Sequence, residues 1–292
     1  MVNWVQEGIG VIEGAVNIGI VNKTDSSFLI DTGIDNSAIN KVLKTIDFDL
    51  NGALITHHHA DHMGGCAKLE SLGIDKLYGP KEELEFFTNP MIEPFTMFGG
   101  SYPPKKLRNR HLEAKPSKNI KSADDNIFGK QIPCPGHSPA HTAYLIDDVL
   151  FSGDAAFTLE TIEKYKLLFA VNPNLAEISL DILEKTDFST MILGHGPICY
   201  DKKSAIDVLR VTKEHYICIR EMVITTIGEK MLYTDLVPNL MKELKIDEIV
   251  GARGVTQYFL YQVPLMGYLG NLMDDKLVYL EFLNNALTIV SE

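Results

Sequence analysis

The pattern of apolar and polar positions divides the first 200 residues into short apolar runs and amphipathic stretches. Runs typical of strands, bounded by Gly, Asn or Asp, cover 15–21, 27–30, 53–56, 130–134 and 143–147. Stretches with helical spacing cover 37–46, a short segment that opens at 63–65, and 175–185. Asn36 or Ser37 is expected to cap the first helix, Gly73 can end the second, and Asn174 is expected to start the third. The alternation predicts a β-then-α organisation.

The segment 80–126 breaks this rhythm. A charged helical stretch at 81–87 is followed by several Pro and Gly pairs and then by the basic run 105–110. Irregular segments of this length inside a domain usually carry function. We therefore expect 80–126 to form a lid or a wall of the substrate site.

After residue 200 the pattern becomes mainly helical. Helical stretches are expected at 203–227, 236–244 and 256–272, followed by runs at 277–283 and 286–290 around Asn284 and Asn285. Two apolar runs joined by a two-residue Asn-Asn turn are typical of a hairpin. Helices followed by a hairpin predict a small helical, winged-helix-like module over 201–292, with an approximate boundary near 200.

The densest chemistry lies directly after the run 53–56. His57, His59, Asp61 and His62 place four metal-capable side chains within six residues. Packing alone has little reason to produce this cluster, because His and Asp are costly to bury without partners. Three further candidate donors each follow a short run and stand next to a glycine: His137, Asp154 and His195. Several strands that end at one edge of a sheet would bring all seven donors together.

Size and charge narrow the classes of protein. A chain of 292 residues with 45% hydrophobic and 9% aromatic content can bury a full core, as one large domain with a small one. The net charge of −12 disfavours binding to phosphate backbones. The four cysteines lack CxxC spacing, which favours reduced thiols. No run is long enough to cross a bilayer and no leader pattern follows Met1, so we expect a cytoplasmic protein that does not enter membranes.

Four motifs in order resemble those of the metallo-β-lactamase-fold hydrolase superfamily, in its glyoxalase-II-like HxHxDH branch. They are the HxHxDH at 57–62, the PGH at 135–137, the GD at 153–154 and the GH at 194–195. The resemblance covers about residues 10–200 and implies an α+β, four-layer αβ/βα sandwich with metals at one edge of the two sheets. The catalytic domain would then be 1–200. The region 201–292 resembles the winged-helix tail found on one branch of the family.

The resemblance also implies a ligand set. Three residues would hold one metal, three would hold the second, and Asp154 would bridge them: His57, His59 and His137 for the first, and Asp61, His62 and His195 for the second. Imidazole and carboxylate donors favour two Zn²⁺ ions, although Fe or Mn would also be accepted. We expect a metal-bridging hydroxide to attack the substrate, with Asp61 as the catalytic residue that steers or relays the proton.

Differences from sister families leave several functions open. His62 in place of Arg and Asp154 in place of Cys argue against antibiotic hydrolysis, and His59 in place of Glu argues against the flavodiiron branch. The first hypothesis is a hydrolase acting on a small ester, thioester or lactone. The alternatives are a phosphodiesterase or endoribonuclease, favoured by the tail and the run 105–110, a mono-iron persulfide dioxygenase, and a binding protein without chemistry. A small molecule is the expected partner, and an exposed apolar patch on the tail would indicate a homodimer.

Several polar residues near the motifs have more than one interpretation. His58 occupies the variable position of its motif and is expected to pack or to face solvent. His141 could support a ligand, face substrate or be structural. Asp31, at the end of a strand, could hydrogen-bond a ligand imidazole or cap a turn. Tyr102, Lys105 and Tyr200 could contact substrate.

Overall fold

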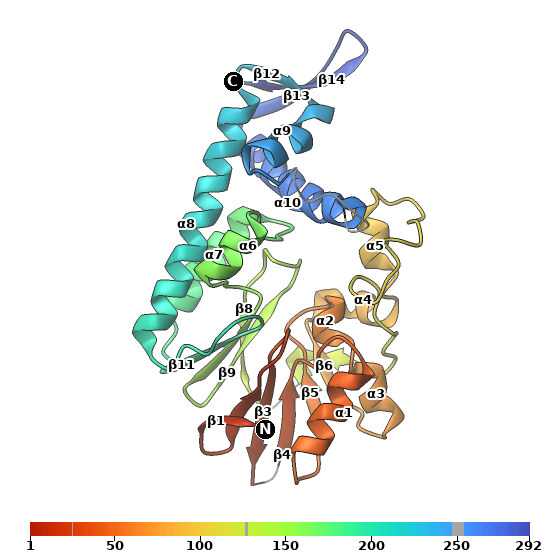
Figure 1. Cartoon of the computed structure of the whole chain (residues 1–292), viewed down its shortest axis with the longest axis vertical. Coiled ribbons are helices and arrows are strands. Elements are labelled where there is room, and N and C mark those ends of the chain that lie inside the picture. The colour runs from red at the N-terminus through yellow and green to blue at the C-terminus, as the bar shows by residue number, and fades with distance from the viewer. Residues whose placement is uncertain (25, 126–127, 247–253) are drawn as a thin grey trace.

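Two β-sheets face each other at the centre of the N-terminal part of the molecule, and helices cover their outer sides (Figure 1). The computed structural model describes residues 1–24, 26–125, 128–246 and 254–292. Asn126, the last residue of the expected wall segment, lies outside the described residues.

The first sheet has seven strands that follow one another in sequence order. They are β1 (Asn3–Gln6), β2 (Ile9–Ile12), β3 (Ile18–Lys23), β4 (Ser26–Ile30), β5 (Gly52–Leu54), β6 (Lys76–Gly79) and β7 (Lys121–Ser122). Strands β1 to β4 pair antiparallel, and β4 to β7 pair parallel. Parallel pairing requires crossover connections, which supply α1 (Asn36–Thr45), α2 (Ala60–Met63) and α3 (Cys66–Ser71) on one side of the sheet.

The second sheet has four strands in the order β11-β10-β9-β8. They are β8 (Lys130–Pro133), β9 (Thr142–Ile146), β10 (Val149–Gly153) and β11 (Thr190–Leu193). Strands β10 and β11 are parallel, and the connection between them contains α6 (Leu159–Tyr165) and α7 (Pro173–Lys185). The parallel arrangement brings the ends of β10 and β11 to the same edge.

Three clusters of buried apolar side chains stabilise the sandwich. Ile30 and Leu54 of the first sheet pack with Tyr144 and Phe151 of the second, which forms the layer between the sheets. A second cluster fills the space between the first sheet and α1 and α3, and a third joins the second sheet to α7 and the C-terminal helices. The predicted α+β class and four-layer arrangement are confirmed.

Two predicted helix caps are wrong by one or two residues. Asp35, rather than Asn36 or Ser37, caps α1, because its extended backbone lets the side chain accept the Ser37 N–H. Asn172, rather than Asn174, caps α7, because Pro173 occupies the first helical turn, where its missing N–H costs nothing.

The segment after β6 forms several short helices instead of one long loop. It contains η1 (Lys81–Glu83), α4 (Leu84–Thr88), α5 (Ile92–Met97) and η2 (Ala123–Asp125). The stretch predicted as one helix at 81–87 is a 3₁₀ turn followed by an α-helix. Met97, Leu107 and Leu112 of this segment pack against the C-terminal helix α10.

In the described residues after 200, the chain forms three α-helices, one short 3₁₀ turn and a three-stranded sheet. The elements are α8 (Lys202–Ile227), β12 (Lys230–Leu232), η3 (Tyr233–Asp235), α9 (Leu236–Glu243), α10 (Gly254–Asp274), β13 (Val278–Leu283) and β14 (Ala286–Ser291). The predicted hairpin is present, with Asn284 and Asn285 at φ values of 49° and 62°, as the tight turn requires. Within the described residues, no helix is both long and apolar enough to cross a membrane. The winged-helix assignment and the boundary near 200 stay predictions.

Candidate metal centre

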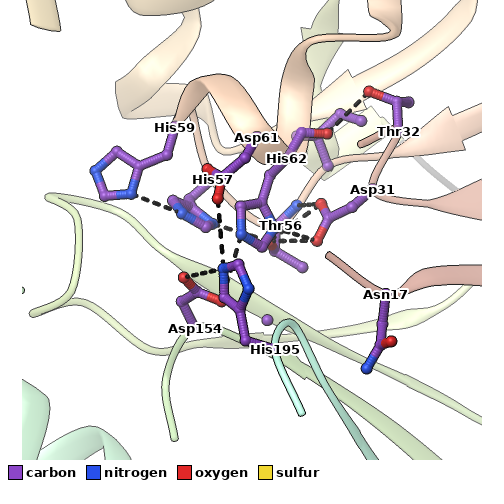
Figure 2. Close-up of polar contacts among 12 residues, drawn as sticks. Asn17, Asp31, Thr32, Thr56, His57, His59, Asp61, His62, Asp154 and His195 are labelled. Atoms are coloured by element: carbon purple, nitrogen blue, oxygen red, sulfur yellow. Dashed lines mark hydrogen bonds and ion pairs between the residues drawn. The ribbon is translucent and has the colours of Figure 1, made fainter. Parts of the chain in front are cut away.

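The segments that follow four strands meet at one edge of the sandwich and carry all seven predicted donors. Figure 2 labels His57, His59, Asp61, His62, Asp154 and His195 among them. His57 and His59 follow β5, and Asp61 and His62 lie on α2. The remaining three donors follow β8, β10 and β11: His137, Asp154 and His195.

Three imidazoles converge on the first group of donor atoms. The Nδ1 atom of His59 lies 2.9 Å from His57 Nε2 and 3.0 Å from His137 Nε2. His57 is fully buried and His137 is 4% exposed. Three nitrogens this close together in a dry site fit one shared ion.

Asp154 lies between this group and a second one. Its Oδ2 atom is 3.6 Å from His137 Nε2 and 3.4 Å from His195 Nε2. Its Oδ1 atom is 3.3 Å from His62 Nε2, and Asp61 Oδ2 is 3.4 Å from His195 Nε2. Asp61, His62 and His195 therefore surround a second space, and Asp154 adjoins both.

Two buried atoms show that these residues suit metal ions. His62 Nε2 and Asp154 Oδ1 are buried, and neither has a hydrogen-bond partner in the described part of the chain. Such atoms are costly to leave unsatisfied, and a cation between them removes the cost. Three donors on each side and one shared carboxylate fit two divalent ions, with coordination positions left for solvent and substrate.

On three of the imidazoles, the ring nitrogen that points away from the candidate metal centre donates a hydrogen bond to an oxygen. This bond fixes the orientation of the ring. His137 Nδ1 donates to the Phe169 carbonyl at 3.0 Å, and His195 Nδ1 donates to the Ala15 carbonyl at 2.6 Å. His62 Nδ1 pairs with Asp31 Oδ2 at 2.8 Å. In each case the partner leaves Nε2 as the free donor for a metal.

Asp31 supports ligands in both groups. Its carboxylate accepts the backbone N–H of Thr56 at 2.8 Å and the Thr56 hydroxyl at 2.9 Å, besides pairing with His62. Because the Thr56 hydroxyl donates to Asp31, its oxygen can accept from His57 Nδ1, which lies 3.0 Å away. The hydrogen bond predicted for Asp31 is present, and Figure 2 shows Asp31 and Asp154 on opposite sides of the His62 ring.

Asp31→Asn should therefore weaken metal binding by about 10- to 100-fold, the usual cost of losing such support. Asp31 has φ 61°, a conformation that Asn tolerates, so the backbone should hold. Asp35→Asn is the matched control, because Asn also caps helices well. Competition with a chromophoric chelator measures the affinity, and equal affinities for the two variants would refute the role of Asp31.

The two groups differ in their affinity for protons. Burial and the surrounding imidazoles lower the pKa of His57 well below its usual range and that of His137 to about 3. Burial also disfavours charge on His62 and His195, but the carboxylate of Asp154 outweighs it and raises their pKa values to about 10 and about 12. Burial alone would raise the pKa of Asp61, but the neighbouring imidazoles lower it to about 2. The imidazoles of the first group are thus neutral at physiological pH, and those of His62 and His195 are protonated when no metal competes, while Asp61 is ionised.

A cavity of about 1080 Å³ opens over the metal centre. His59, Asp61, His137, Asp154 and His195 line its base. Its walls come from β2 and β3, from the 80–126 segment, from the connection between β10 and β11 and from α10. Their apolar side chains include Ile12, Ile18, Leu112, Phe157, Leu168, Phe169, Leu260 and Tyr261. The segment 80–126 forms part of the wall, through residues such as Glu93, Lys106 and Leu112.

The other residues singled out from the sequence have varied positions. His141 is buried and its Nε2 accepts the Asp154 backbone N–H at 3.0 Å, so it supports a donor loop. Tyr200 is exposed and accepts a hydrogen bond from Asn3. Tyr102, Lys105 and Tyr200 are not among the described residues that line the cavity, so the contacts suggested for them are not supported.

Of the two alternatives given for His58, the structure supports packing rather than exposure to solvent. The side chain is buried between two carboxylates, 2.6 Å from Glu83 and 2.9 Å from Glu93. Burial alone would lower the pKa of His58, but these carboxylates raise it to about 9. Sequence reasoning missed both glutamates, and it missed Asn17, which donates to the carbonyls of Leu193 and Gly196 beside His195. No local motif marks these residues.

Close packing requires glycine at position 194, directly before the donor His195. A β-carbon there would lie 2.2 Å from Asp154 Oδ1 and 2.9 Å from the His62 ring. Any side chain would displace the donors on both sides. At this position the backbone therefore passes directly beside the donors.

The geometry and the motifs agree with a comparison of protein families. Residues 11–195 match the metallo-beta-lactamase superfamily, and the chain therefore belongs to that superfamily. Among curated proteins, the chain is 37% identical over 145 residues to a hydroxyacylglutathione hydrolase of Shewanella denitrificans, covering 48% of this chain and 47% of that protein. It is 34% identical over 179 residues to the protein of the same name from Shewanella loihica, covering 60% and 59%. The matches thus span about half the length of these relatives.

Solved structures share the fold over a larger part of the chain. A metallo-beta-lactamase family protein from Thermus thermophilus superposes with a TM-score of 0.72 at 18% identity, covering 99% of this chain and all of that one. A beta-lactamase domain protein from Burkholderia ambifaria gives 0.68 at 18% identity and covers 100% and 93%. The likeness to both proteins includes the C-terminal region.

Proposed function

We propose that the protein is a dinuclear metal-dependent hydrolase that acts on a thioester, or on a related ester or lactone. The observation that carries the proposal is the arrangement of seven donors around two adjoining spaces at the base of one cavity. A purely structural site would be closed, whereas the side chains of Asp61 and His195 are 31% and 29% exposed and face the cavity. The family and the name of the curated relatives support hydrolysis, since hydroxyacylglutathione is a thioester.

Each donor has a specific role in this proposal. His57, His59 and His137 would hold one ion, Asp61, His62 and His195 would hold the other, and Asp154 would be shared between them. Two divalent ions held there, of which Zn²⁺ suits these donors best, would supply Lewis acidity that lowers the pKa of a water molecule and polarises a carbonyl. Asp61 is ionised at neutral pH and lies at the cavity surface, where it accepts and relays the proton of the attacking water.

The cavity favours a substrate with an apolar acyl group. Its volume and its apolar walls are typical of small-molecule sites. The basic run that suggested a polyanionic substrate is partly neutralised, because Arg108 pairs with Glu113 and Arg110 pairs with Asp35. Only Lys106 and Asn109 of that run line the cavity, where the basic Lys41 and Lys164 are balanced by the acidic Glu13, Glu93 and Glu160.

Acyl thioesters of one thiol, with chains from about two to ten carbons, should give kcat/KM values that rise about two- to fourfold per methylene until the cavity is full. Leu260→Glu should flatten this trend, because it places a charge on the apolar wall. Leu277→Glu is the control, since Leu277 is 48% exposed and is not among the described lining residues. A flat series for the unmodified protein would contradict the apolar acyl site while leaving hydrolysis intact.

Metal analysis combined with turnover assays tests the proposal as a whole. We expect two divalent ions per chain and hydrolysis of a thioester reporter, with weaker activity on lactone and phosphodiester reporters. Preferred cleavage of the phosphodiester would instead support the endoribonuclease-like alternative. One iron per chain with oxygen consumption would support the dioxygenase, and full metal loading without turnover would support a binding protein.

A cytoplasmic location belongs to the same proposal. Cys66, Cys134, Cys199 and Cys218 are free thiols in the structure, as expected in a reducing compartment. The first three are buried, and burial raises the pKa of Cys66 to about 12. The three buried thiols are thus packing residues rather than nucleophiles.

A further inference from the structure

A single buried carboxylate connects the two loops that carry the first group of donors. Glu83 is 0% exposed and ends the short helix η1, directly before α4. Its Oε2 atom accepts the backbone N–H of His58 at 2.8 Å and lies 2.6 Å from His58 Nδ1. Its Oε1 atom accepts the Ser138 hydroxyl at 2.5 Å and the Ala140 N–H at 2.8 Å.

These four contacts join segments that are distant in sequence. His58 stands between the donors His57 and His59, and Ser138 directly follows the donor His137. Glu83 thus fixes the position of the first loop relative to the second, through backbone as well as side-chain atoms. The three donor nitrogens that must meet at one ion come from these two loops alone.

His58 extends the connection to the cavity wall. Its Nε2 atom is 2.9 Å from Glu93 Oε2, on α5, and its ring packs on Phe86 at a centroid distance of 3.9 Å. The other oxygen of Glu93 lies 3.8 Å from His59 Nε2, the nitrogen that faces away from the first group. The same network therefore contacts the His59 ring on the side that faces away from the first group.

The energetics argue against a chance arrangement. A carboxylate buried without partners is strongly destabilising, and here every contact comes from a donor loop. Removing the carboxylate would leave two backbone N–H groups and a hydroxyl without their acceptor, and replacing one of its oxygens by the NH2 group of Gln would leave one of the two loops without its acceptor. The loops could then satisfy these groups only by moving.

We infer that Glu83, together with His58, is a positioning residue that fixes the two donor loops relative to each other, so that His57, His59 and His137 can share one ion. The inference rests on the proposed metal centre but not on any particular substrate. It assigns a role to His58, which occupies the variable position of the HxHxDH motif and is not itself a metal donor.

Glu83→Gln, compared with Glu82→Gln on the adjacent exposed position, tests the inference with Co²⁺ as the probe. We expect Glu83→Gln to weaken Co²⁺ binding about 10- to 100-fold and to alter the visible d–d absorption of the bound ion, and Glu82→Gln to change neither. Metal content of the unmodified protein tests the proposed function, whereas the difference between the two variants tests the inference alone.

Thermal unfolding of the metal-free variants separates positioning from stability. A lower Tm for Glu83→Gln with unchanged Co²⁺ affinity and spectrum would assign Glu83 to stability only and overturn the inference. If Glu83→Gln does not fold, Ser138→Ala decides the question, because it removes one of the four contacts. It should weaken Co²⁺ binding about threefold or more, and unchanged binding would also overturn the inference.

Discussion

Asp154→Asn should lower kcat/KM for a thioester substrate by about a thousandfold or more and reduce the metal content from two ions towards one. Asp154 is 5% exposed and is the only one of the predicted donors that adjoins both groups through its two oxygens. Its loss removes a shared anionic donor, and several kcal/mol of transition-state stabilisation depend on both ions.

Asp148→Asn provides the control for this experiment. Asp148 lies in the exposed turn between β9 and β10 and accepts a hydrogen bond from Ser189. The two variants carry the same chemical change on the same sheet, so a difference between them reports the metal centre. Elemental analysis and steady-state kinetics give the two readings. An Asp154→Asn protein with two ions and unchanged turnover would contradict the assignment of Asp154 as the shared donor.

The second ion should bind far more tightly as the pH rises, with an affinity that grows up to about a hundredfold per pH unit between about pH 6 and 8. His62 and His195 have pKa values raised to about 10 and about 12 in the metal-free chain, because the carboxylates around them outweigh the effect of burial. Each must release its proton before it can bind a metal, and two released protons give this slope.

The first ion should show almost no such dependence over the same interval. His57, His59 and His137 have pKa values lowered below the ordinary value near 6.5, so above that pH they bind a metal without releasing protons. Titration calorimetry in buffers of different ionisation enthalpy counts the protons released with each ion. Equal proton release for both ions would contradict the division into two groups.

The same shifts determine how the pH affects the metal-free fold. A raised pKa of His62 and His195 stabilises the folded state fully below the ordinary value near 6.5, and this contribution is lost as the pH rises through about 10 and 12. The lowered values of the first group act in the opposite direction, because the unfolded chain takes up protons there as the pH falls below about 6.5. Added metal replaces the protons on His62 and His195, so it should stabilise the fold most at neutral to alkaline pH.

The seven donors could be predicted from sequence because each one stands at the end of a short apolar run. Strands that end at one edge bring the residues after them together, so the motifs after β5, β8, β10 and β11 were expected to meet. In the structure β5 belongs to the first sheet and the other three strands to the second. The hairpin around Asn284 was also predictable, since two residues with positive φ favour Asn. These signals are local, and the chain shows them without knowledge of its partners.

The tertiary structure alone decided what surrounds the donors. Glu83 looks like one residue of a charged surface helix, and only the fold turns it inward, between His58 and Ser138. Likewise Leu260 is separated from the metal motifs by dozens of residues, and only the packing of α10 against the 80–126 segment makes it part of the cavity. The sequence by itself determined which side chains can bind metal and at which strand ends they lie. The supporting contacts and the shape of the cavity depend on long-range packing, which no local spacing encodes.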